Sequence, residues 1–175
     1  HARQMRADGS ELPAIMGVSA ATGGFAPNGG GAGSLTMNCP EVKEAAGAFL
    51  TALSTRYKGH PGLLGYDVWN ECNYAPSVDY NPHTKAAFRV WLQEKYGDLD
   101  TLAKAWYRYS YAEWDDIEPP RQIAPYPECL DWLDFKRENY YGQMQFRIDT
   151  IRAVDSDCLI AAHGVAGAIP DMAAR

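Results

Sequence analysis

Two short apolar segments, separated by helical patterns, constrain the fold of this chain most. Residues 63–69 (LLGYDVW) and 159–162 (LIAA) are typical of buried strands. Each follows a segment whose apolar residues recur at helical spacing. Strands that alternate with helices predict a parallel sheet, because parallel strands need long crossover connections. The sequence therefore predicts an α/β fold.

Helix-start and helix-stop signals divide residues 38–175 into a helix–strand–helices–strand core. We expect Asn38 to cap the first helix, with Glu41 three residues later, and Gly97 to end the second helix. The predicted helices span residues 38–57, 81–96, 98–107 and 128–154. Residues 1–37 are expected to be irregular, because residues 23–34 (GGFAPNGGGAGS) are rich in glycine.

Composition restricts the classes of partner. The net charge is −6 and the pI is about 5.1, which disfavours a nucleic-acid partner. No apolar run approaches the roughly 20 residues of a membrane helix, so we expect no membrane partner. The four cysteines form no C-x-x-C pair, which predicts free thiols and no zinc ribbon. The charge fits a neutral or small-molecule partner, and no cofactor is expected.

The residues that follow the first predicted strand are suited to acid/base chemistry. Glu71 and Asn70 stand at the strand's carboxyl end, and His163 follows the second strand. Sites form at the carboxyl ends of parallel strands. An apolar wall such as Trp69 or Tyr74 would raise the pKa of Glu71, and Asn70 could hydrogen-bond a hydroxylated substrate. From the dipeptide alone, a turn or helix cap explains Asn-Glu at least as well.

A series of motifs between residues 38 and 163 is more specific than that dipeptide. In order, they are Asn38-Cys39-Pro40, Arg56-Tyr57-x-x-His60-Pro61, Gly65-Tyr66-x-Val68-x-Asn70-Glu71, Ala87-Phe88-Arg89-x-Trp91-Leu92-x-x-Lys95-Tyr96-Gly97, Leu99-x-x-Leu102-x-x-Ala105-Trp106, Ile117-x-Pro119-Pro120-Arg121 and Asp134-Phe135-Lys136-Arg137. The series resembles glycoside hydrolase family 42, the β-galactosidase family among the (β/α)₈ retaining glycosidases.

The resemblance implies a role for each matching residue. Glu71 would be the general acid/base at the end of the fourth barrel strand, and Asn70 would bind the sugar's 2-hydroxyl. The family's nucleophile lies near the seventh strand, which this chain does not reach. At 175 residues, against about 250 for a complete barrel, the chain is expected to be a partial TIM barrel, from about helix 3 to strand 5. Because it begins with His1, we expect it to start inside a longer gene or after a cleavage, and alone to show no normal turnover.

Further substrate contacts are expected from Tyr74, His163 and Trp69, although a structural role explains His163 equally well. Asp67 shares the strand parity of Glu71 and would either tune it or make a structural hydrogen bond. Trp69 departs from the family pattern, which favours a polar residue there.

The remaining aromatic residues divide into two groups. The candidates for stacking on a sugar are Tyr109, Tyr111 and Trp114, and those assigned to packing are Trp91, Trp106 and Trp132. The loop after Asn-Glu offers only Cys72 and His83 as ligands, so we predict no metal site.

Three functional readings stay open at this point. The first is hydrolysis of β-galactosides, and the second is action on a β-glucan or β-mannan. The third is a non-catalytic carbohydrate-binding relative. All three predict a carbohydrate partner. Unpaired strand edges leave self-association, including a homo-oligomer, open.

Overall fold

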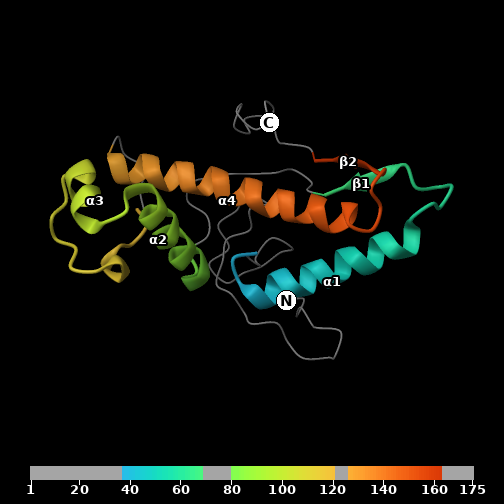
Figure 1. The fold of residues 1–175 in the computed structure, drawn as a ribbon, viewed down its shortest axis with the longest axis horizontal. Coiled ribbons are helices and arrows are strands. Elements are labelled where there is room, and N and C mark those ends of the chain that lie inside the picture. The colour runs from blue at the N-terminus through green and yellow to red at the C-terminus, as the bar shows by residue number, and fades with distance from the viewer. Residues whose placement is uncertain (1–36, 69–79, 121–125, 163–175) are drawn as a thin grey trace.

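One long helix connects the two halves of the fold (Figure 1). The computed structural model describes residues 37–68, 80–120 and 126–162. In chain order the elements are α1 (Pro40–Tyr57), β1 (Gly65–Asp67), α2 (Pro82–Tyr96), α3 (Leu99–Trp106), the 3₁₀ turn η1 (Trp114–Asp116), α4 (Pro127–Arg152) and β2 (Leu159–Ala161). The N-terminal end of α4 lies beside α2 and α3, and its C-terminal half lies beside α1 and the strands. Within the described residues, no helix is both long and apolar enough to cross a membrane.

The two strands are parallel neighbours, as the alternation of patterns predicts. Gly65 is paired with Leu159, and Asp67 with Ala161. About ninety residues separate the strands in sequence, and α2, α3 and α4 all lie in the crossover. The predicted α/β architecture is therefore confirmed for the part of the chain that the structure describes.

Helices cover one face of this strand pair. Tyr66 and Val68 of the first strand segment and Ile151 of α4 are buried there. Their partly buried apolar neighbours come mainly from α1, α4 and β2: Leu50, Leu53, Leu63, Met144, Ile148, Cys158 and Ile160. This burial is the main apolar contact that holds α1 and α4 against the strands.

A second core, rich in aromatic rings, occupies the other end of α4. Its buried members come from α2, α3, the following connector and α4: Phe88, Leu92, Leu102, Trp106, Ile117, Trp132 and Phe135. The rings of Phe88 and Trp132 meet edge to face, with centroids 5.0 Å apart. Trp91 is half-buried against the same cluster. The packing role predicted for Trp91, Trp106 and Trp132 is confirmed.

A buried carboxylate ties three of these elements together. Asp131 of α4 is only 4 % exposed. Its carboxylate accepts hydrogen bonds from Lys95 Nζ at 2.7 Å, the Tyr96 hydroxyl at 2.6 Å and Trp106 Nε1 at 2.7 Å. Burial and this carboxylate raise the pKa of the Tyr96 phenol. Asp131 therefore fixes the register of α4 against both α2 and α3.

Replacing Asp131 with alanine should cost about 3 kcal/mol of unfolding free energy, because the Tyr96 and Trp106 donors would lose their acceptor. Urea unfolding followed by tryptophan fluorescence measures the change. The matched control is Asp134→Ala on the same helix, whose partly exposed pair with Arg137 is worth less than about 0.5 kcal/mol. Equal, small losses in both variants would contradict the role assigned to Asp131.

Local signals place most helix ends correctly, with one exception. The Asn81 side chain accepts from Thr84 N–H at 3.0 Å, and Gly97 ends α2 with φ of 78°. The predicted cap at Asn38 is wrong, because Cys39 is the N-cap residue of α1 and makes no side-chain cap bond. Asn38 Nδ2 instead donates to the Thr84 hydroxyl at 2.8 Å. Its amide thus connects the starts of α1 and α2.

The helical spacing of Phe49 in residues 38–57 and of Leu130 in residues 128–154 predicts that both lie on an apolar helix face, and the structure corrects both expectations. Phe49 and Leu130 have helical spacing but are exposed. The buried residues of α1 are Val42 and Ser54, and Leu50 and Leu53 are partly buried against the strands. Near the start of α4, the aromatic core lies on the side of Trp132 and Phe135, which turns Leu130 outward.

A non-glycine residue adopts the left-handed conformation after α3. Tyr107 has φ of 56° and ψ of 35°. This region costs a residue with a Cβ about 1–2 kcal/mol. We therefore expect Tyr107→Gly to raise the unfolding free energy by about 0.5–1 kcal/mol, after allowing for glycine's greater freedom in the unfolded chain. Thermal unfolding tests this, with Gly97→Ala as the reverse control. Destabilisation by Tyr107→Gly would mean that the ring contributes packing energy.

Candidate active site

The carboxyl ends of β1 and β2 lie at one edge of the strand pair. Val68 N–H donates to the Ala161 carbonyl at 2.8 Å, one residue beyond β1. The chain leaves the two strands from this shared edge, and such an edge is where parallel sheets place their sites.

The predicted site residues follow this edge in the sequence. Trp69, Asn70 and Glu71 come directly after Val68, and His163 comes directly after Ala162. These four residues and Tyr74 lie outside the described residues. Their mutual contacts therefore stay predictions.

In the described part of the chain, the face of the strands opposite the helices is exposed. Leu159 is 64 % exposed and Asp67 is exposed, whereas Tyr66 and Val68 on the helix side are buried. Side chains alternate along a strand, so Asp67 lies on the face opposite Tyr66 and Val68. That Glu71 shares this face stays a prediction. Parallel strands are ordinarily covered on both faces. The exposed face is thus the side on which a further layer of protein would be expected.

A glycine permits the close approach of the two strands. A Cβ added at Gly65 would lie 2.5 Å from the Leu159 carbonyl oxygen and 2.8 Å from the Leu159 Cβ. The carbonyl belongs to the backbone, so it could give way only by separating the strands. Gly65 therefore helps to position the carboxyl edge of the strand pair, which Glu71 follows in the sequence.

Gly65→Ala should destabilise the protein by about 2 kcal/mol or more, because the added methyl group overlaps the partner strand. The control is Gly142→Ala in α4, where an added Cβ meets nothing within 4 Å and a gain of about 0.5–1 kcal/mol is expected. Urea unfolding of both variants tests the pair. A Gly65→Ala variant as stable as the parent would show that the strands do not need this approach.

A cavity of about 450 Å³ lies between α1, β1 and α4. Its lining is mainly apolar and includes Phe49, Leu53 and Val68, with Asp67 and Arg147 as the charged members. Tyr66 also lines it, and burial raises the pKa of the Tyr66 phenol. No hydrogen-bond partner of the Tyr66 hydroxyl is found among the described residues. The predominantly apolar lining suits packing better than a sugar.

The structure separates the predicted stacking aromatics. Trp106 is buried and bonded to Asp131, and Tyr111 meets it edge to face with ring centroids 6.2 Å apart. Trp114 is half-buried against the aromatic core. Of the candidates in the described connector, only Tyr109 has a largely exposed ring. Sequence reasoning missed the exposed rings of Tyr107 and Tyr126, because exposure depends on tertiary packing.

Among the described residues, Cys39, Cys129 and Cys158 form no disulfide, while Cys72 lies outside them. Burial is the main cause that raises the pKa of the Cys39 and Cys158 thiols, which disfavours the thiolate form that binds metals. In the part of the chain that the structure describes, no three His, Cys, Asp or Glu residues gather as a metal site would require. The predicted absence of a metal site stays a prediction for the loop that holds Cys72.

Comparison with known proteins decides the family. Residues 12–173 match the family model described as the β-galactosidases of glycoside hydrolase family 42. The chain belongs to glycoside hydrolase family 42. The β-galactosidase BgaP of Planococcus sp. (strain L4) is 35 % identical over 128 residues, which are 66 % of this chain and 18 % of BgaP. The β-galactosidase LacZ of Heyndrickxia coagulans is 32 % identical over 111 residues, or 59 % of this chain and 17 % of LacZ. The chain thus spans under a fifth of the length of these two relatives.

Solved structures show the same fold. The β-galactosidase from Bacillus circulans sp. alkalophilus superposes with a TM-score of 0.73 at 24 % identity, over 89 % of this chain and 24 % of that protein. The apo exo-carrageenase of Bacteroides ovatus superposes with a TM-score of 0.68 at 20 % identity, over 78 % of this chain and 20 % of that protein. The described strands and helices are therefore a segment of the family 42 (β/α)₈ barrel.

Proposed function

We propose that the protein acts as a retaining β-galactosidase in which Glu71 is the general acid/base. The observation that carries this proposal is the match to family 42 across residues 12–173. The pairing of β1 with β2 supports it, since Asn70-Glu71 follows directly from the carboxyl edge of a parallel pair.

In the proposed reaction, Glu71 first protonates the glycosidic oxygen as the bond to the leaving group breaks. A second carboxylate, outside this chain, attacks the anomeric carbon and forms a glycosyl-enzyme. Glu71, now ionised, then takes a proton from water as the water attacks that intermediate. Asn70 holds the sugar's 2-hydroxyl during both steps. Each proton that Glu71 gives in the first step is recovered in the second.

A second candidate substrate is a different glycan. The superposed Bacteroides ovatus protein is described as an exo-carrageenase, so the shared fold also occurs in a protein named for another polysaccharide. Trp69, where a polar residue is usual, motivates the same alternative for this chain. Hydrolysis rates on a panel of aryl glycosides distinguish the two, and a preference for the β-galactoside is expected.

The direct test is Glu71→Gln in the complete polypeptide that carries this chain. We expect kcat on an unactivated galactoside to fall by about a hundred- to ten-thousandfold, because the variant lacks the proton donor. With an aryl galactoside whose leaving group needs little protonation, added azide should restore turnover and give β-galactosyl azide. Azide attack needs no general base.

The matched control is Glu94→Gln, an exposed carboxylate on α2, which should leave kcat unchanged. Circular dichroism verifies that both variants fold. If Glu71→Gln keeps the parental kcat, Glu71 is not the acid/base and the proposal fails.

A further inference from the structure

Three tyrosines of the described chain expose their rings near the α3 end of the molecule. Tyr107 is 81 % exposed, Tyr109 is 72 % exposed and Tyr126 is 58 % exposed. Tyr107 and Tyr109 belong to the connector after α3, and Tyr126 directly precedes α4. We call these three residues the tyrosine patch.

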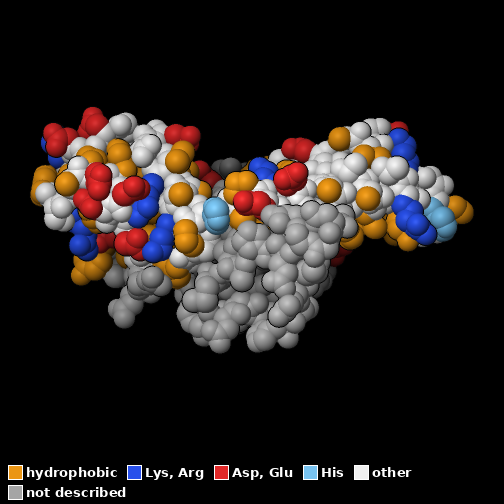
Figure 2. All heavy atoms as spheres, turned by 90° about the horizontal axis from the view of Figure 1, so that it is seen from below, with side chains coloured by type: hydrophobic (Ala, Val, Ile, Leu, Met, Phe, Trp, Pro, Cys, Tyr) orange, Lys and Arg blue, Asp and Glu red, His pale blue; other side chains and the backbone are white. Residues whose placement is uncertain are grey.

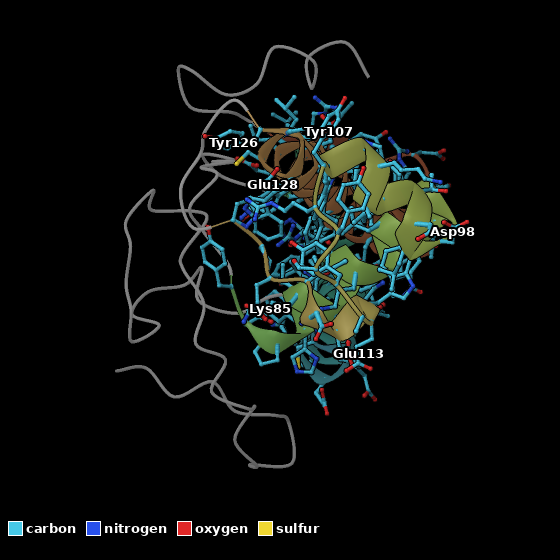
Figure 3. The ribbon with its side chains drawn as sticks, turned by 90° about the vertical axis from the view of Figure 1, so that its left-hand side faces the viewer. Lys85, Asp98, Tyr107, Glu113, Tyr126 and Glu128 are labelled. Atoms are coloured by element: carbon cyan, nitrogen blue, oxygen red, sulfur yellow. The ribbon has the colours of Figure 1, made fainter. Side chains whose placement is uncertain are left out.

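An ion pair holds the two parts of the patch together. Arg108, between the first two tyrosines, donates from Nε and Nη2 to Glu128 Oε1 at 2.9 and 2.6 Å. Glu128 lies two residues after Tyr126. Figure 3 shows Tyr107, Tyr126 and Glu128 along the same edge, away from Asp98, Lys85 and Glu113. The patch is therefore a local surface built on one ion pair.

The strained backbone of Tyr107 indicates that its exposed ring has a binding role. The residue has φ of 56°, which glycine adopts freely and tyrosine does not. Its ring is exposed, so core packing does not offset this strain. Strained positions of this kind concentrate at ligand-binding sites. Tyr111, by contrast, turns inward against Trp106 and anchors the segment.

The charge around the patch favours a neutral ligand. Arg108 is the cation between the tyrosines, and Glu128 neutralises it. Over the α2–α3 end in Figure 2, acidic and basic side chains are intermixed rather than gathered by sign. Lys85 and Arg89 there pair with Glu118 and Asp115. A phosphate-bearing ligand would be expected to need unpaired cations.

We propose that the tyrosine patch binds a neutral glycan chain by stacking sugar rings on the aromatic faces. The apolar C–H face of a sugar suits an exposed ring, and the phenol hydroxyls can hydrogen-bond its hydroxyl groups. The choice of ligand class rests on the proposed function. The surface itself rests on exposure, strain and the Arg108–Glu128 pair.

Affinity electrophoresis tests this binding without turnover. The complete polypeptide carrying Glu71→Gln is run in gels that contain β-1,4-galactan or hydroxyethylcellulose. We expect retardation in at least one of these gels. Tyr109→Ala, Tyr126→Ala and Tyr107→Gly should each weaken the apparent affinity by about three- to tenfold, as for the loss of one aromatic contact. Tyr109→Trp should keep the affinity or increase it.

The matched control is Tyr57→Ala, because Tyr57 is a partly exposed tyrosine at the far end of α1. It should leave the retardation unchanged. No retardation in either gel, or equal loss in Tyr57→Ala, would overturn the proposal. Activity of the Glu71-containing polypeptide on a small aryl galactoside is measured separately. Its absence would count against the proposed function and leave the binding result standing.

Discussion

A parallel pair of three-residue strands is too small to be stable alone. The long helix α4 supplies the buried apolar contacts that stabilise it. The helix is the last part of the crossover that makes the parallel arrangement feasible. Its C-terminal half buries Ile151 against Tyr66 and Val68, while its start forms the aromatic core with α2 and α3. Asp131 fixes the start of α4 against α2 and α3. The position of the strand edge therefore depends also on the contacts that α4 makes at its far, N-terminal end.

That dependence explains why the two faces of the strands differ. The helix face is packed, whereas Asp67 and Leu159 on the other face are exposed. In family 42 proteins the remaining barrel strands would complete the closed sheet, and this chain spans under a fifth of two curated relatives. Gly65 brings β1 and β2 close enough to begin that sheet. The chain thus has the geometry of a barrel segment rather than of an independent two-layer domain.

Predictions from sequence succeeded where one residue meets a local requirement of the backbone. Asn81 and Gly97 mark the ends of α2 because a side-chain cap and a positive φ are local requirements. Such predictions failed where a contact with another helix determines what a side chain does. Asn38 looks like a cap but bonds Thr84 of α2, and Leu130 has helical spacing but faces away from the core. Helical periodicity identifies a helix, whereas the direction of its buried face is set by its neighbours.

For the candidate site, the sequence predicted the strand pair and its shared edge. Glu71 and Asn70 were candidates because of their place after the predicted strand, and the serial order of the family's motifs gave them their proposed roles. The exposed rings of Tyr107 and Tyr126 could not be predicted, because neither residue type nor spacing states which side chains remain at the surface. Tyr107 in particular occupies a position where the backbone favours glycine.

The most direct measurement of the central claim is affinity labelling of the complete polypeptide. N-bromoacetyl-β-galactosylamine places an electrophile where the glycosidic oxygen binds, so it alkylates the carboxylate that serves as acid/base. The account predicts time-dependent inactivation, protection by galactose, and a mass-shifted peptide whose modified residue is Glu71. Labelling of a different carboxylate, with Glu71 unmodified in the inactivated protein, would contradict it.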